Sequence, residues 1–242
     1  MRHRTRRGVI DYRLTLPGKA PSRWGFEEFT LTRHGDGARV LRARCELHDE
    51  PPLIRDVIQT VDADFHPQDV YVRLTIADRF HGSSWYRFTD TQAELEGFTV
   101  EQGRISDKRP VSRAMRGFGT HALMADAWLS ARFDFRRGVG IQTFTNNLLT
   151  SLDHRGATGP AFAVTTSALR YHGAEDVTVP AGTYACHHFA FENTSNDHPP
   201  YDMWVTTDGD FVFVKGVVAE PYNWSFELIR DRTDPEDYEA DV

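Results

Sequence analysis

The chain has 242 residues but little cysteine, with Cys45 and Cys186 as its two thiols. A small domain stapled by disulfides needs more cysteines than this, so that class of fold is excluded. A single disulfide stays open, but two thiols so far apart in the sequence favour buried, reduced side chains.

Long apolar segments and an excess of positive charge are also missing. No apolar run could cross a membrane as a helix, and the N-terminal MRHRTRRGVIDYRL lacks the apolar core and cleavage site of a signal peptide. We therefore expect no membrane insertion and a cytoplasmic location. Lys and Arg number 28 against 35 Asp and Glu, a formal net charge of −7. This balance gives no general attraction to nucleic acid, which we do not expect as a partner.

The familiar motifs of metal, nucleotide and nucleophile sites are absent as well. The 11 histidines show no H-x-x-x-H or H-E-x-x-H spacing, and there is no C-x-x-C. His187 and His188 are adjacent, so on a strand they point to opposite faces. There is no G-x-S-x-G, and no dinucleotide or phosphate loop. We expect no metal and no cofactor, although scattered ligands that meet in the fold stay open.

Short runs rich in β-branched and aromatic residues fill the chain instead, about ten residues apart and separated by Gly, Pro or polar residues. The clearest stretch is Asp176–Val218, where two aromatic runs flank a polar loop and a third follows a turn. This pattern predicts a mostly β protein with a single curved antiparallel sheet, a half-barrel or barrel. Further strands are predicted at Val9–Leu16, Trp24–Arg33, Val40–Leu47, Leu53–Val61, Val70–Ala77, His81–Thr89, Gln92–Val100, near Gly103, at Ala161–Tyr171 and up to Ile229.

One or two short helices should fill or cap the concave side of this sheet. After Thr120, a plausible N-cap, apolar residues follow at helical spacing and predict one helix. The segment Thr145–His154 predicts a second short helix or turn. We assign residues 1–242 to one domain, in which residues 1–8 and 231–242 are expected to form loosely held tails.

Three segments resemble a known group of proteins. They are TNNLLTSLDH, VPAGTY ahead of a strand, and YDMWVTTDGDFVFVKGVV, all after Phe135. This part is similar to an uncharacterised bacterial family of half-barrel β proteins, which resemble the outer-membrane lipoprotein carriers and the cofactor-free violacein-pathway enzyme. The resemblance implies a curved sheet wrapped around a helix, with a cavity on its concave side. It implies no particular chemistry, because such folds include carriers and an enzyme.

Acid–base chemistry is the remaining class of catalysis that the residues suggest. His121 stands at the start of the first predicted helix, where the positive end of the helix dipole lowers the pKa of an imidazole and keeps it neutral. Asp126 follows five residues later, and Trp128 offers an aromatic wall. The plainer alternative is that His121 only caps the helix and that Asp126 is solvated.

Several strands carry polar and aromatic side chains that a semi-polar cavity could use. Tyr71 and Arg73 share one strand face and could hold a carboxylate or an enolate oxygen. The same pair could equally form a stripe on the surface. The expected binding residues are Trp85, Arg87, Trp128, His188, Trp204 and Tyr222.

These residues give a first hypothesis and two alternatives. The first is a cofactor-independent lyase or isomerase that acts on a small apolar or aromatic molecule, with or without a carboxylate. In it His121 moves a proton, Asp126 orients His121, and Tyr71 with Arg73 holds substrate charge. The alternatives are a non-catalytic carrier of a hydrophobic ligand and a purely structural or interaction domain. Assembly into a homodimer stays open.

Overall fold

A single sheet organises the molecule, as seen in a computed structural model that describes residues 3–112, 117–194 and 198–234. The sheet has 15 strands in the order β8-β7-β6-β5-β4-β3-β2-β1-β15-β14-β13-β12-β11-β10-β9. The strands are β1 (His3–Leu14), β2 (Ser22–His34), β3 (Arg39–Leu47), β4 (Leu53–Val61), β5 (Pro67–Ile76), β6 (Arg79–Phe88), β7 (Gln92–Thr99), β8 (Gly103–Pro110), β9 (Phe118–Gly119), β10 (Gly140–Leu149), β11 (Ala163–Val179), β12 (Gly182–Glu192), β13 (Tyr201–Thr206), β14 (Phe213–Val218) and β15 (Trp224–Thr233).

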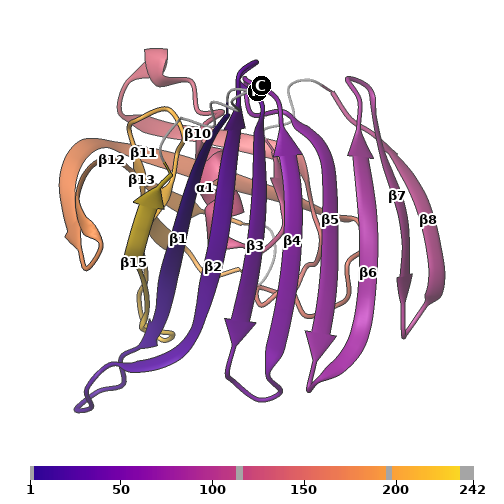
Figure 1. Cartoon of the computed structure of the whole chain (residues 1–242), viewed down its shortest axis with the longest axis horizontal. Coiled ribbons are helices and arrows are strands. Elements are labelled where there is room, and N and C mark those ends of the chain that lie inside the picture. The colour runs from indigo at the N-terminus through magenta and orange to yellow at the C-terminus, as the bar shows by residue number, and fades with distance from the viewer. Residues whose placement is uncertain (1–2, 113–116, 195–197, 235–242) are drawn as a thin grey trace, which may run out of the picture.

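Two meanders make up this sheet, and they join where β1 pairs with β15. Neighbouring strands are antiparallel, except for the parallel pair of β9 and β10. The outermost strands, β8 and β9, do not pair with each other, so the sheet is curved but not closed. We call β1 to β8 the N-terminal wall and β10 to β14 the C-terminal wall. In Figure 1 the C-terminal wall crosses behind the N-terminal wall.

The helix α1 (Leu123–Ser130) lies between the two walls, on the concave side of the sheet (Figure 1). It contacts β3 of the N-terminal wall as well as β9, β13 and β14. Met124, Ala127 and Trp128 of this helix are buried in one core with side chains from both walls. The predicted mostly β, curved, single-sheet fold with a helix on its concave side is therefore confirmed.

Alternation of side chains explains why the N-terminal wall forms strands. In β3, Leu41, Ala43 and Cys45 are buried, while Arg42 and Arg44 between them are exposed. Such a period of two places one apolar face on the core and one charged face in water. Cys45 and Cys186 are both buried and free, as expected from their number and separation.

The N-terminus of α1 is capped by a residue from a distant strand. The predicted cap at Thr120 is wrong, because the helix begins after Ala122 and no local side chain caps it. Instead the carboxylate of Glu27, in β2, accepts hydrogen bonds from the backbone N–H groups of Leu123, at 2.7 Å, and Met124, at 3.0 Å. Glu27 is fully buried, and burial raises the pKa of its carboxyl group.

One local prediction holds only in part. The segment Thr145–His154, predicted as a short helix or turn, contains the end of β10 followed by bends and a turn, and not a helix. Asn146 there has φ = 56°, a left-handed conformation that asparagine tolerates and that interrupts the pairing of β10 with β11. The one other helical element in the described residues is a 3₁₀ turn, η1 (Phe135–Arg137).

The expected tails are also shorter than predicted. Residues 3–8 belong to β1 and pair with β2, and residues 6–8 also pair with β15. Residues 231–233 belong to β15. The rest of the predicted tails, apart from Asp234, lies outside the described residues. In the described part of the chain, no helix has the length and apolar character to span a bilayer.

Candidate functional site

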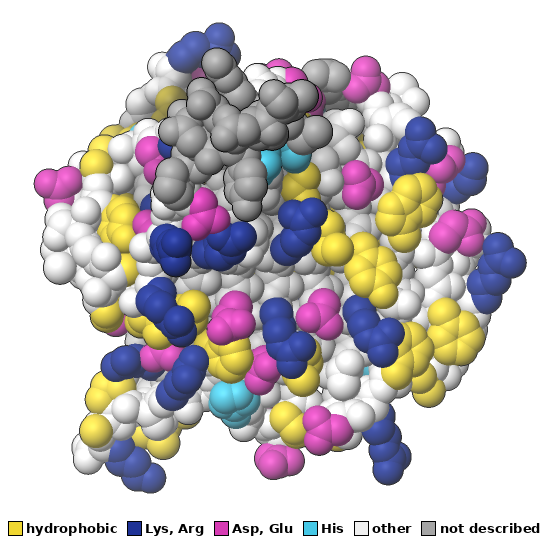
Figure 2. Space-filling view, in the orientation of Figure 1, with side chains coloured by type: hydrophobic (Ala, Val, Ile, Leu, Met, Phe, Trp, Pro, Cys, Tyr) yellow, Lys and Arg dark blue, Asp and Glu magenta, His cyan; other side chains and the backbone are white. Residues whose placement is uncertain are grey.

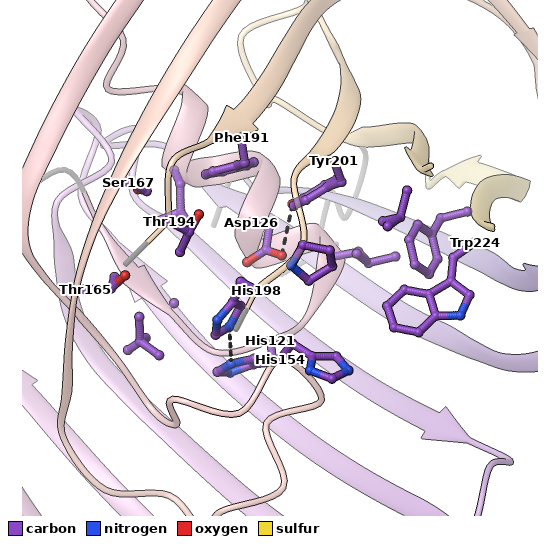
Figure 3. A pocket seen from close by; sticks show the side chains of 17 residues that line it. His121, Asp126, His154, Thr165, Ser167, Phe191, Thr194, His198, Tyr201 and Trp224 are labelled. Atoms are coloured by element: carbon purple, nitrogen blue, oxygen red, sulfur yellow. Dashed lines mark hydrogen bonds between the residues drawn. The ribbon is translucent and has the colours of Figure 1, made fainter. Parts of the chain in front are cut away.

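A cavity opens between α1 and the C-terminal wall, with a volume of about 170 Å³ (Figure 3). Its walls are mostly apolar and include Leu129, Leu149, Phe191, Trp224 and Phe226. Polar side chains enter it from α1, from the segment before α1, from the chain between β10 and β11, from β11 and β13, and from the chain between β12 and β13. They are His121, Asp126, His154, Thr165, Ser167, Thr194, His198 and Tyr201.

Two histidines meet at one side of the cavity. The Nε2 atoms of His121 and His198 are 3.1 Å apart, and Nδ1 of His121 is 3.2 Å from the hydroxyl oxygen of Thr150. A hydrogen bond between two ring nitrogens uses one proton, so at least one of the two imidazoles is neutral. Both ring nitrogens of His121 are in these hydrogen bonds, so His121 can accept a proton from a bound molecule where one of the two bonds opens.

The backbone holds His121 in an unusual conformation. Its backbone φ angle is +61°, a value that residues other than glycine adopt rarely. The guanidinium of Arg55, in β4, donates to the backbone oxygen of His121 at 2.7 Å and also to the backbone oxygen of Arg155. Arg55 is 2% exposed, so these bonds are shielded from water. The N-terminal wall thus fixes the residue that enters the cavity.

The pKa of the His121 imidazole lies well below its ordinary value. Burial is the largest cause, followed by the positive charge of Arg55 and then by His198. Burial and a neighbouring cation both disfavour the protonated ring. The sequence analysis attributed a neutral His121 to the helix dipole. In the structure, the low pKa of His121 is caused mainly by burial and by the charge of Arg55.

Asp126 faces the same cavity from the first turn of α1 (Figure 3). Burial raises the pKa of its carboxyl group to about 7, and the nearby Glu27 adds to the rise. The hydroxyl of Tyr201 donates to Oδ2 of Asp126 at 3.1 Å, and the ring of Tyr201 stacks on Phe191 at 5.0 Å. Asp126 therefore keeps its proton to a much higher pH than an ordinary aspartic acid does.

His121 and Asp126 line the same cavity, as predicted. The prediction that Asp126 orients His121 is not met by the hydrogen bonds described above, which join Asp126 to Tyr201 and His121 to His198 and Thr150. The sequence analysis did not find His198 and Tyr201, their partners across the cavity. Tyr201 lies on the same face of β13 as the buried Met203 and Val205, and this shared inward face was the available signal. His198 follows a polar loop and gives no comparable signal.

Four of the predicted site residues lie on the outward face of the N-terminal wall, which is the face turned away from α1. In β5 the inward positions are Val70, Val72 and Leu74, so Tyr71 and Arg73 point outward. Arg73 lies over the ring of Phe80, 4.7 Å from its centroid. The expectation that these side chains share a cavity with His121 is wrong.

Trp85 and Arg87 of β6 pair with this outward row. Trp85, opposite Tyr71, is 41% exposed, and Arg87 is exposed as well. Figure 2 shows this face of the molecule, on which hydrophobic and charged side chains are interspersed. Both residues were expected to bind substrate in the cavity, and their placement contradicts that expectation.

The remaining predicted binding residues also lie outside the cavity lining. Trp128 is buried in the core, where its indole N–H donates to the backbone oxygen of Asp210 at 3.2 Å. His188 and Trp204 stack on each other at 4.2 Å, on the face of β12 and β13 that points away from α1. Tyr222 packs on Trp224 at 4.5 Å, beside the cavity wall.

Among the described residues, one group of His, Cys, Asp and Glu side chains has a spacing suited to a metal ion. It consists of His172, His188 and Asp202. This group is also on the outward face, so it is separated from the cavity by the sheet.

Comparisons with known proteins identify the fold. A beta-barrel-like protein of the domain of unknown function DUF1849 from Brucella abortus superposes with a TM-score of 0.59 at 9% identity, over 96% of this chain and 98% of that chain. The chain has this beta-barrel-like fold. At such low identity the likeness concerns the fold alone.

A DUF1089 family protein from Pseudomonas aeruginosa has a TM-score of 0.49 at 11% identity, over 86% of this chain and 96% of that chain. No protein-family model and no curated protein matches the sequence.

Proposed function

We propose that the protein is a cofactor-independent enzyme of lyase or isomerase type that moves a proton on a small apolar or aromatic molecule. The observation that supports the proposal is that one cavity contains two groups whose pKa values are shifted in opposite directions, Asp126 and His121. Asp126 holds a proton near neutral pH, with a pKa of about 7, while His121 stays neutral. A carboxyl group with a raised pKa and an imidazole with a lowered pKa can act as acid and base at the same pH.

The size and walls of the cavity limit the substrate class. A cavity of about 150 Å³ lined by apolar side chains holds one benzene ring. The volume here, about 170 Å³, accommodates one ring or a short branched chain with a small polar substituent. Phe191, Trp224 and Phe226 favour a flat, apolar body.

Each polar residue has a role in the proposed reaction. The neutral imidazole of His121 or His198 takes a proton from a C–H bond of the substrate, and the electron pair of that bond stays on the substrate. Asp126 gives its proton to a second atom of the same molecule, which completes an isomerisation. In an elimination, Asp126 protonates the leaving group instead. Tyr201 positions Asp126 through their hydrogen bond.

The second candidate is a carrier that binds a hydrophobic molecule and leaves it unchanged. The mostly apolar walls favour it. The sequence analysis expected a likeness to lipoprotein carriers and to a cofactor-free enzyme, but the similar structure reported above is a protein of unknown function, so this expectation favours neither candidate. The two differ in whether the titratable groups act on a bound molecule.

Hydrogen exchange separates the two functions. Small molecules extracted from the purified protein are identified by mass spectrometry, then returned to fresh protein in D₂O together with single-ring carbonyl compounds. Replacement of C–H by C–D, or formation of product, is followed by NMR. The enzyme should promote exchange, and His121→Ala or Asp126→Asn should slow it by about 10²- to 10⁴-fold.

The matched control is Arg73→Ala, which changes a charged residue on the outward face. It should exchange as fast as the wild type. A molecule that binds in the cavity but undergoes neither exchange nor conversion would reject the enzyme and leave the carrier.

A further inference from the structure

We infer that His172, His188 and Asp202 form a binding site for a divalent transition-metal ion of the zinc type. One ligand atom of each residue lies within 4.8 Å of the others. The three residues come from the adjacent strands β11, β12 and β13. The site is on the outward face of the C-terminal wall, so it is independent of the function proposed for the cavity.

An irregularity in β11 brings His172 to this site. The pairing of β11 with β12 shifts between Tyr171, opposite Phe189, and Gly173, opposite His188. His172 is the extra residue of this bulge, and Gly173 beside it has φ = +116°. A bulge of this kind redirects a side chain. Here it places the ring of His172 on that of His188, with centroids 4.5 Å apart.

A carboxylate lies beside each ring nitrogen of His188. Its Nε2 is 2.8 Å from Oδ1 of Asp202, and its Nδ1 is 3.3 Å from Oε1 of Glu175. The indole N–H of Trp204 donates to the same Glu175 oxygen at 2.7 Å. Metal-bound histidines commonly donate their second ring N–H to a carboxylate, which fixes the tautomer and the ring. Glu175, which lies beside Nδ1 and is held by Trp204, is the carboxylate that would position His188 in this way.

Stacking holds the His188 ring in place before any ion binds. The rings of His188 and Trp204 are 4.2 Å apart and inclined by 18°. Because the strands also fix the backbone, the site loses little conformational freedom on binding. His172 is exposed, so its side chain can make the small rotation that closes the site.

The ligand chemistry selects the ion. Two imidazoles and one carboxylate suit zinc and its neighbours, and calcium or magnesium prefers oxygen ligands. Tetrahedral zinc with bonds of about 2.0–2.1 Å needs ligand atoms about 3.4 Å apart, so a shift of about 1 Å brings the three residues into place. The fourth position faces solvent. Asp202 and Glu175 bring two negative charges, against the Lys215 ammonium, which is 5.4 Å from the centre of the Trp204 ring.

The competing arrangement is a metal-free one, in which His188 bridges Asp202 and Glu175 directly. Calorimetric titration of the full chain with Zn²⁺ separates the two. The wild type should bind a single equivalent, and His188→Ala, His172→Ala and Asp202→Asn should each weaken binding at least tenfold. Glu175→Gln should weaken it by about tenfold through loss of positioning.

Two matched variants test where the ion binds. His66→Ala alters another histidine beside a carboxylate, Asp62, and should leave zinc binding unchanged. His198→Ala removes an imidazole from the cavity and should also leave it unchanged. Loss of binding in His198→Ala with binding retained in His188→Ala would overturn the proposal, and so would an absence of zinc binding to the wild type.

A spectroscopic readout distinguishes ligation from loss of folding. Co²⁺ should give visible absorption bands of a four-coordinate ion in the wild type and not in His188→Ala. The far-UV circular dichroism of that variant should match the wild type, because His188 is on the sheet surface. Identical Co²⁺ spectra for the two proteins would overturn the assignment.

Discussion

The two walls of the sheet use their polar and charged side chains differently. In the N-terminal wall, Glu27 and Arg55 are 0% and 2% exposed, and both bind backbone groups around the start of α1. In the C-terminal half, Tyr201 and His198 are half-buried and meet Asp126 and His121 across a cavity. One wall is a scaffold, and the other completes a site.

This difference shows how the fold divides its tasks. A buried charge is costly unless it is fully hydrogen-bonded, and such bonding leaves it little freedom to react. Glu27 and Arg55 are used in this way, to fix residues 121–124. Residues beside the cavity keep room for a ligand. We therefore expect substitutions in the N-terminal wall to affect folding, and those in the C-terminal wall to affect chemistry.

The largest effect should come from Glu27→Ala. This change leaves the N–H groups of Leu123 and Met124 without their acceptor and removes the partner of the Tyr12 hydroxyl. Unsatisfied buried groups and the vacated volume should lower the free energy of unfolding by about 4 kcal/mol, measured by urea denaturation. Glu27→Gln keeps an acceptor and the volume, and should lose about 1–2 kcal/mol. Equal losses in the two variants would contradict the capping role.

A smaller effect, dependent on pH, should follow from Asp126→Asn. The pKa of Asp126 is raised to about 7 in the fold, from an ordinary value of 3.8. Because the fold favours the protonated group, this residue stabilises the protein at low pH, and the stabilisation is lost as the pH rises through about 7. Asp126 borders the cavity, so the loss is about 2 kcal/mol and not the full shift.

Urea denaturation of the wild type and Asp126→Asn at pH 5 and pH 8 measures this difference. The wild type should lose stability between the two pH values by more than the variant does, while turnover or ligand exchange falls in the variant at both. If the two proteins show the same pH dependence, Asp126 does not titrate in this range.

The outer strands of the fold were predictable, because alternation is a local property of the sequence. The predicted strand Val40–Leu47 differs from β3 (Arg39–Leu47) by one residue. In the C-terminal half, Asn146 at φ = 56° interrupts the pairing of β10, and the segment TNNLL, which belongs to this strand, was assigned to a short helix or turn. Bulges and positive φ values concern single residues, which pattern analysis does not resolve.

The site was predictable only where its residues are close in sequence. His121 and Asp126 are only five residues apart in the sequence. In contrast, His198 is 77 residues from His121, and Tyr201 is 75 residues from Asp126. Alternation also shows which residues share a face without showing which face is inward. For this reason Arg73 was assigned to a cavity that the opposite face of the sheet lines.

His198→Ala should have a more modest effect, confined to the site. It removes the hydrogen bond between the two Nε2 atoms, which should lower the stability by about 1 kcal/mol. His198 is one of the causes that lower the pKa of His121, so that pKa should rise in the variant and still stay below its ordinary value because of burial. NMR titration of the imidazole signals measures the change, and an unmoved His121 pKa would show that the two rings do not interact.

The smallest effect should come from the outward face of the N-terminal wall, and Arg73→Ala tests it. The side chain is exposed and lies over Phe80, and an exposed cation–π contact contributes about 0.5 kcal/mol. The variant should therefore unfold within about 0.5 kcal/mol of the wild type, with unchanged exchange of cavity ligands. Because Val72 and Leu74 on either side of Arg73 fill the inward face, its guanidinium cannot reach the cavity without inverting the strand. A loss of exchange in Arg73→Ala comparable to that in Asp126→Asn would mean that the outward face takes part in the reaction and that the division between the two walls is wrong.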